Sequence, residues 1–184
     1  VYASERGDRR VLTYGQLLHL VRRVAAGLRG LGVRRGDRVT IYMPTCPEAI
    51  ALMLGCVRVG AIHSVVFAGF GAGALADRVG ASGSKWVFTA DVTYRKGAQV
   101  PLKGIVDEAL RQVPGGVEGV VVLERSPEGA SLEPGRDLSW DRFLARAEGQ
   151  SSDFEPMEAN EPAYILATSG TTCLLYTSPS PRDS

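Results

Sequence analysis

The chain has 184 residues, which is long enough for one ordinary domain with a hydrophobic core. Its 45% hydrophobic and 22% charged residues exclude a disordered polypeptide, and its net charge of +1 offers no electrostatic basis for binding nucleic acid or an anionic membrane. The three cysteines have no paired spacing, so the sequence predicts neither a disulfide framework nor a zinc site and favours a reducing, cytoplasmic location.

The N-terminal part of the chain predicts an amphipathic helix followed by a strand. Thr13 and Gln16 have the spacing of a capping box, and apolar residues then recur at helical intervals until Gly32 ends the pattern. Residues 39–43, which begin with three β-branched side chains, are typical of a strand. The same two kinds of element alternate along most of the remaining chain.

A second helix is predicted directly after this strand. Thr45 and Glu48 repeat the capping-box spacing and would open the helix. The apolar residues that continue its pattern are Ile50, Leu54 and Val57. On this reading the helix begins immediately behind the end of the strand.

Residues 59–76 need a membrane check, because they run for eighteen positions without a formal charge. The stretch is rich in glycine and changes from β-branched to small residues near its middle. This composition favours a buried strand, a turn and the start of a helix over a membrane-spanning segment.

Strands and helices alternate through the rest of the sequence. Helices of this length between strands are typical of a parallel sheet covered on both faces, so the predicted fold class is α/β with a mostly parallel sheet flanked by helices. Polar residues 124–137 predict a surface loop. The remaining predicted elements are strand 61–67, helix 72–81, strand 86–89, helix 102–112, strand 117–123, a short helix capped by Ser139 that ends at 147, and strand 163–167.

The last predicted strand leads into a loop rich in hydroxyl groups. Unpaired backbone N–H groups in such a loop form an anion site, and the hydroxyls add donors for phosphate oxygens. Ser-Gly-Thr-Thr is also an ordinary turn after a strand, and no Gly-Lys-Ser/Thr follows, so this is not a Walker loop. The residues of the candidate phosphate loop are Thr168, Ser169, Gly170, Thr171 and Thr172.

A competing interpretation uses the glycines after strand 61–67. Gly69, Gly71 and Ala74 fit the pattern G-x-G-x-x-A at the start of a helix, and Asp91 follows the next strand at about the distance expected of a ribose ligand. An NAD(P)-binding Rossmann-type domain is therefore the alternative. The lone His63 lies in an apolar strand, where a buried histidine bonded to backbone is the more frequent case, and it is assigned no catalytic role.

Ordered sequence blocks over residues 8–172 resemble the adenylate-forming, or AMP-binding, superfamily. Residues 164–172 are similar to the entrance of its signature loop, which continues Gly-Lys-Pro-Lys-Gly. The blocks His-Ser-Val-Val-Phe at 63–67 and Ala-Leu-Ala-Asp-Arg at 74–78 resemble the acetyl-CoA synthetase and short-chain acyl-CoA synthetase branch. Further similar blocks lie at 36–39, 42–44, 47–49, 60–62, 89–91 and 101–103.

The resemblance implies a ligase that uses ATP, CoA and Mg²⁺ on a small carboxylate such as acetate or propionate. It forms an acyl-adenylate and pyrophosphate, and the acyl group then passes to the CoA thiol. The candidate phosphate loop would be part of the ATP site. The resemblance also implies that Gly71 and Gly73 are local sequence variation and not glycines that bind a pyrophosphate. No catalytic side chain and no metal ligand is assigned in this chain. The residues implied in CoA binding are Phe67, Ala68, Gly69, Arg95, Lys96, Gly97 and Ala98.

Two departures from the family pattern bear on these expectations. The family commonly has a second basic residue where this chain has Ala98, and Lys96 could substitute for it as a point charge. Residues 173–184 resemble the translation of a sequencing adapter, so we expect a partial N-terminal AMP-binding domain over 1–172 and a non-native tail over 173–184. Such a fragment would be inactive alone. If the tail is genuine, the alternative is a non-catalytic nucleotide-binding module.

Overall fold

The computed structural model describes residues 1–167 and contains a six-stranded sheet in the order β10-β4-β3-β5-β8-β9. Every pair of neighbouring strands in this sheet is parallel, which confirms the predicted α/β fold class. The strands are β3 (Arg38–Tyr42), β4 (Ile62–Val65), β5 (Trp86–Ala90), β8 (Gly119–Leu123), β9 (Asp137–Ser139) and β10 (Tyr164–Ile165).

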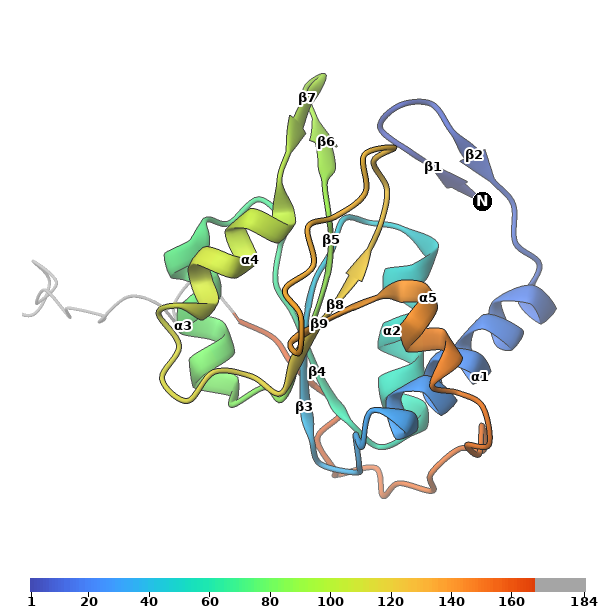
Figure 1. Ribbon diagram of the computed structural model, residues 1–184. Helices are drawn as coiled ribbons and strands as arrows, with labels where there is room; N and C mark the ends of the chain where they lie inside the picture. Colours follow the sequence, from blue (N-terminus) through green and yellow to red (C-terminus); the bar gives the residue numbers. More distant parts are fainter. Residues whose placement is uncertain (168–184) are drawn as a thin grey trace, which may run out of the picture.

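Helices cover both faces of the sheet (Figure 1). One layer contains α1 (Tyr14–Gly30), α2 (Pro47–Arg58) and α5 (Trp140–Ala145), and the other contains α3 (Ala72–Ser82) and α4 (Leu102–Leu110). Successive residues of β5 point to opposite faces of the sheet. Phe88 packs in the core under α1, α2 and α5, and Val87 packs in the core under α3 and α4.

The first helix begins as the sequence predicts. Thr13 accepts a hydrogen bond from the backbone N–H of Gln16, and the side chain of Gln16 accepts one from the backbone N–H of Thr13. Close packing then depends on glycine: a Cβ at Gly27 would lie 2.9 Å from the ring of Phe143 in α5. A glycine at this position therefore allows the two helices to approach each other.

The start of α2 differs from the prediction. Thr45 is not the cap, because Pro47 is the first helical residue and pushes Cys46 into an extended conformation, so the helix cannot begin before it. Glu48 accepts a hydrogen bond from Arg10 instead. The apolar residues that indicated this helix are also largely outside the core, because Ile50, Leu54 and Val57 are 39%, 45% and 44% exposed. Its buried residues are Pro47, Ala49, Ala51, Leu52, Gly55 and Cys56.

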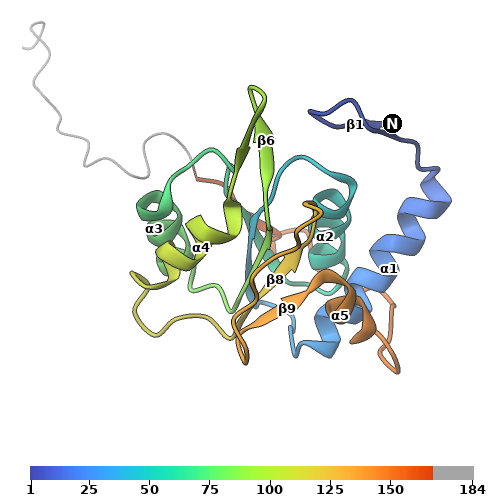
Figure 2. The same ribbon diagram turned by 45° about the horizontal axis from the view of Figure 1, so that its top comes forward.

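Two small antiparallel hairpins were not predicted from the sequence. One joins β1 (Tyr2–Ala3) to β2 (Arg9–Arg10), and the other joins β6 (Thr93–Arg95) to β7 (Ala98–Val100). The turn of the second hairpin is Lys96-Gly97, with φ of 51° and 79°, and positive φ at both central residues is the requirement of a type I′ turn. Both hairpins extend beyond the edge at which β5 ends (Figures 1 and 2).

The uncharged stretch 59–76 contains β4, a loop and the start of α3, as predicted. Several strands are shorter than their sequence patterns suggested, β4 and β10 most clearly, whereas Ser139 caps α5 as expected. Within residues 1–167, no helix combines the length and the apolar character that crossing a membrane requires.

Candidate functional site

The direction of the chain creates a crevice between β3 and β4. The connection that leaves β3 enters α2 on one face of the sheet, and the connection that leaves β4 enters α3 on the opposite face. Neighbouring parallel strands whose connections diverge in this way leave a gap at their carboxyl ends, which is the usual ligand site of open α/β sheets. A cleft of about 580 Å³ lies at this point.

The cleft brings together residues from four separate parts of the chain. Residues 43–45 come from the end of β3, residues 65–69 from the end of β4, and residues 93–95 from β6. The N-terminal residues 1–3 and Glu5 complete the lining. Four predicted CoA residues, Phe67, Ala68, Gly69 and Arg95, therefore meet in one cleft, although Arg95 lies 26 positions after Gly69 in the sequence.

Gly69 lies beneath two side chains of the cleft. A Cβ at this position would lie 2.7 Å from Nη1 of Arg95 and 2.9 Å from Cζ of Phe67, so only glycine leaves room for both. Cζ of Arg95 lies 5.6 Å from the centre of the Phe67 ring, within the range of a cation–π contact. Within residues 1–167 the Arg95 guanidinium forms no salt bridge, so its donors can serve an anionic ligand.

The loop that carries Phe67 is fixed at its other end by Phe70. The Tyr42 hydroxyl at the end of β3 donates a 2.6 Å hydrogen bond to the carbonyl oxygen of Phe70. The guanidinium of Arg78 in α3 lies over the Phe70 ring at 4.4 Å and donates to the carbonyl of Ala74. Arg78 therefore has a structural role, and the loop is attached to both β3 and α3.

The other three residues implied in CoA binding lie at the tip of the β6–β7 hairpin and do not line the cleft. Lys96 and Gly97 form the turn, and Ala98 is the direct partner of Arg95 across the hairpin. Directly opposite residues of an antiparallel pair project from the same face. A basic side chain at position 98 would therefore project on the same side as Arg95, whereas Lys96 occupies the turn itself.

One acidic residue lines the cleft and was not predicted from the sequence. Glu5 accepts a hydrogen bond from Thr93 and forms an ion pair with Arg125 at 3.4 Å. Partial burial opposes ionisation of Glu5, but its hydrogen bonds and the charge of Arg125 outweigh this effect and lower its pKa. The negative charge of Glu5 is thus balanced by Arg125, and its side chain attaches the N-terminal segment to the β6–β7 hairpin. No motif in the sequence marks this contact, because it joins residues far apart in the chain.

The candidate phosphate loop cannot be placed in the same way. Its residues, Thr168, Ser169, Gly170, Thr171 and Thr172, lie outside the described residues. The strand before them, β10, pairs in parallel with β4, so its carboxyl end faces the edge at which the cleft lies. A second hollow of about 350 Å³ lies between β10 and α3 and is lined by Ser64, Asp77, Arg78, 81–82 and 165–167.

The dinucleotide-binding alternative fails at Asp91. A ribose ligand needs free carboxylate oxygens, but Asp91 is buried and its two oxygens accept three backbone N–H donors, from Val92, Arg125 and Ser126. Gly71 caps α3 with open space around it, so no close backbone approach requires a glycine there. The structure therefore does not support the Rossmann-type interpretation.

His63, Cys46 and Cys56 do not line the cleft. Nδ1 of His63 is buried without a hydrogen-bond partner among residues 1–167, so the backbone bond expected of a buried histidine is not formed there, and burial lowers its pKa. Cys46 and Cys56 are buried free thiols, and burial raises their pKa to about 11 and about 12. Such thiols are packing residues.

Comparison with known proteins identifies the family. A family described as AMP-binding enzyme matches residues 1–174. The chain belongs to the AMP-binding enzyme family. The match covers both layers of helices and the whole of the sheet, including the strands that form the crevice.

Individual relatives of this AMP-binding protein are acyl-CoA synthetases. It is 48% identical to the 3-hydroxypropionyl-coenzyme A synthetase of Sulfurisphaera tokodaii over 93% of the chain, and 46% identical to the acetyl-coenzyme A synthetase of Xanthobacter autotrophicus over 90%. The solved structure of acetoacetyl-CoA synthetase from Streptomyces lividans matches with a TM-score of 0.77 and 30% identity over 91% of the chain. The chain spans only 26%, 25% and 25% of the lengths of these three proteins.

Proposed function

We propose that the complete protein is an AMP-forming ligase that joins a short-chain carboxylate to CoA. The observation that carries the proposal is the meeting of Phe67, Gly69 and Arg95 in the cleft between β3 and β4. Membership of the AMP-binding family and the acyl-CoA synthetase relatives support the same reaction class. Two buried free cysteines agree with the reducing cytoplasm, where we propose that the protein acts.

The proposed reaction has two steps. A carboxylate oxygen attacks the α-phosphorus of ATP and displaces pyrophosphate, which gives an acyl-adenylate. The CoA sulfur then attacks the acyl carbon and AMP leaves, while the thiol proton is released. Adenylation replaces a poor leaving oxygen with a good one, so the protein must chiefly position the reactants and stabilise phosphate charge.

The described residues of this chain would serve the CoA step. Phe67 offers an aromatic surface for the adenine ring of CoA, Gly69 allows close approach to the backbone, and Arg95 offers a fork of donors to phosphate. The candidate phosphate loop would hold the phosphates of ATP. Mg²⁺ would neutralise their charge, but residues 1–167 contain no group of three His, Cys, Asp or Glu side chains suited to a metal, so no ligand is assigned to it.

The acyl substrate is proposed to be a two- or three-carbon acid. The sequence resemblance favours acetate or propionate, and the relatives named above include an acetyl-coenzyme A synthetase and a 3-hydroxypropionyl-coenzyme A synthetase. A small apolar pocket separates acids that differ by one methylene by only about 10- to 200-fold in kcat/KM. We therefore expect measurable turnover of more than one of these acids.

The test is ATP–pyrophosphate exchange by the complete protein with each acid, followed by acyl-CoA formation after CoA is added. We expect exchange that depends on the acid but not on CoA, and we expect the 184-residue chain alone to give none. Absence of acid-dependent exchange in the folded complete protein would refute the ligase proposal. Binding of ATP without any exchange would instead support a non-catalytic nucleotide-binding module.

The CoA site has a separate test at Ala98. Ala98→Arg places a second guanidinium on the same face of the hairpin as Arg95, so KM for CoA should fall by about fivefold to tenfold. Lys96→Ala is the comparison, because it removes the cation of the turn itself. An unchanged KM for CoA in Ala98→Arg would show that this face of the hairpin does not meet a phosphate group.

A further inference from the structure

Buried charges hold both ends of the β6–β7 hairpin. Asp91 immediately precedes the segment that forms the hairpin, and Lys103 follows it at the start of α4. These residues are only 4% and 7% exposed, which is unusual for ionised side chains at the ends of a surface hairpin. The backbone N–H of Lys103 also donates to the carbonyl oxygen of Asp91, at 3.2 Å, so the two ends are bonded to each other.

The first end is fixed by the Asp91 carboxylate. Oδ1 accepts hydrogen bonds from the backbone N–H groups of Val92 at 2.6 Å and Arg125 at 2.8 Å. Oδ2 accepts one from the backbone N–H of Ser126 at 2.8 Å. One carboxylate therefore binds the beginning of the hairpin to the connection between β8 and β9.

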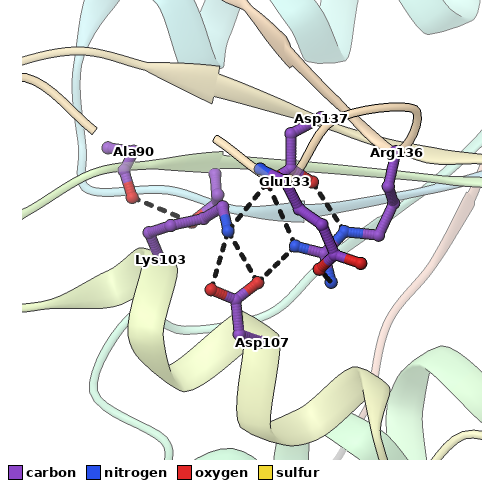
Figure 3. A network of polar contacts seen from close by, with 7 residues as sticks. Ala90, Lys103, Asp107, Glu133, Arg136 and Asp137 are labelled. Carbon is purple, nitrogen blue, oxygen red and sulfur yellow. Dashed lines mark hydrogen bonds and ion pairs between the residues drawn. The ribbon is translucent and has the colours of Figure 1, made fainter. Parts of the chain in front are cut away.

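The second end is fixed by Lys103 (Figure 3). Its Nζ lies 2.8 Å from Oδ2 of Asp137 and 2.6 Å from Oδ1 of Asp107. Arg136 contacts both of these carboxylates, so the four side chains form one network between α4 and the start of β9. Asp137 also accepts the backbone N–H of Glu133, again within the β8–β9 connection.

These contacts are poorly suited to providing stability alone. Removing a lysine and a carboxylate from water costs most of what their attraction returns, so well-packed apolar residues would serve stability equally well. What the charges do provide is a defined geometry: both ends of the hairpin are attached to the same neighbouring segment. Arg95 lies four positions from Asp91 and projects from this hairpin towards Gly69.

We propose that Asp91 and Lys103 are positioning residues of the CoA site, which hold the β6–β7 hairpin so that Arg95 lies over Gly69 and faces a phosphate of CoA. The proposal rests on the proposed ligase function. It assigns neither residue a contact with substrate. Their effect should therefore pass through Arg95 and should be confined to CoA.

The experiment measures KM for CoA and KM for ATP in the complete enzyme, with thermal unfolding of each variant. Lys103→Met removes the lysine but leaves Asp137 paired with Arg136, so the fold should survive. The matched control is Lys85→Met, which removes a lysine whose ion pair with Asp37 lies at the amino-terminal ends of β5 and β3, away from the cleft. We expect Lys103→Met to raise KM for CoA about tenfold and KM for ATP less than about twofold, and Lys85→Met to change neither.

A double variant separates positioning from general damage. Arg95→Ala alone should raise KM for CoA by at least about tenfold, and Arg95→Ala with Lys103→Met should raise it no further, because the lysine acts through the arginine. Multiplied effects, or an unchanged KM for CoA in Lys103→Met, would overturn the proposal. If Lys103→Met does not fold, Asp91→Asn provides the same test. The asparagine N–H₂ group cannot accept the backbone N–H that one Asp91 oxygen accepts, so the attachment to Arg125 or Ser126 would be lost.

The ligase function and the positioning proposal fail differently. Acid-dependent ATP–pyrophosphate exchange requires no CoA, so its absence in the unmodified enzyme would refute the function itself. Normal exchange together with an unaltered KM for CoA in the folded variants would refute the positioning role alone.

Discussion

Replacing Gly69 by alanine tests whether the cleft between β3 and β4 is the CoA site. The new methyl group would lie 2.7 Å from Nη1 of Arg95 and 2.9 Å from Cζ of Phe67. Ordinary contacts between such atoms are about 3.5–4.0 Å, so each neighbour must move by about 1 Å. The φ of Gly69 lies outside the left-handed region, and backbone strain is therefore not part of the effect.

The size of the effect follows from where these neighbours lie. Both side chains are exposed, so they can move into solvent and the free energy of unfolding should change by less than about 0.5 kcal/mol. A displacement of about 1 Å in a site that positions a substrate can cost about a hundredfold. Arg95 is long and can partly recover its position, so we expect KM for CoA to rise about tenfold.

The assay is acyl-CoA formation by the complete enzyme at varied CoA, with ATP–pyrophosphate exchange measured alongside. Gly73→Ala is the matched control, because Gly73 lies four positions away with open space around it. We expect KM for CoA to rise in Gly69→Ala only, while exchange continues in both variants. An equal KM for CoA in the two variants would refute the assignment of the cleft to CoA.

Three further predictions concern the folded chain. Gly27→Ala should lower the melting temperature by about 3 °C, because its Cβ would lie 2.9 Å from the Phe143 ring. Gly80→Ala is the comparison: it has open space around it and should stabilise the chain by up to about 1 kcal/mol. Equal shifts of the two melting temperatures in calorimetry would contradict this packing. Burial lowers the pKa of His63 below 6.5, so just below that pH the unfolded chain binds more protons than the folded chain and the free energy of unfolding should decrease with acidification. Urea titrations should show this slope, and His63→Gln should make it shallower. Burial raises the pKa of Cys56 to about 12, so iodoacetamide at about pH 8 should leave this thiol unmodified in the native protein and alkylate it in urea, as peptide mass spectrometry would show.

Local signals predicted much of the fold. The capping box of α1 involves residues three apart, and the alternation of strands and helices needs only short windows of sequence, so both could be recognised without tertiary information. The start of α2 was placed wrongly because the capping-box spacing at Thr45 was given more weight than Pro47, which prevents the preceding residue from being helical. Its apolar residues were a sound sign of a helix but not of its buried face.

The candidate site was predicted through family resemblance and not through pattern. Phe67 and Arg95 come from separate elements, and only the crossing of the chain from β4 to α3 and back to β5 brings them together. The hairpins at the site have strands of two or three residues, which are too short to show a period of two. Contacts such as Glu5 with Arg125 and Lys103 with Asp137 join distant positions, so a single sequence carries no sign of them.

The diverging connections of β3 and β4, and not any one side chain, determine where the crevice lies. The residues at its rim can therefore be changed without moving the crevice. The turn Lys96-Gly97 is exposed and makes up the whole of the connection between β6 and β7. A longer loop grafted there would extend one wall over the crevice without disturbing any strand of the sheet. Changes of ligand preference in engineered or natural variants of this protein should therefore concentrate in that turn and in the segment 67–71, while the layers beneath remain as they are.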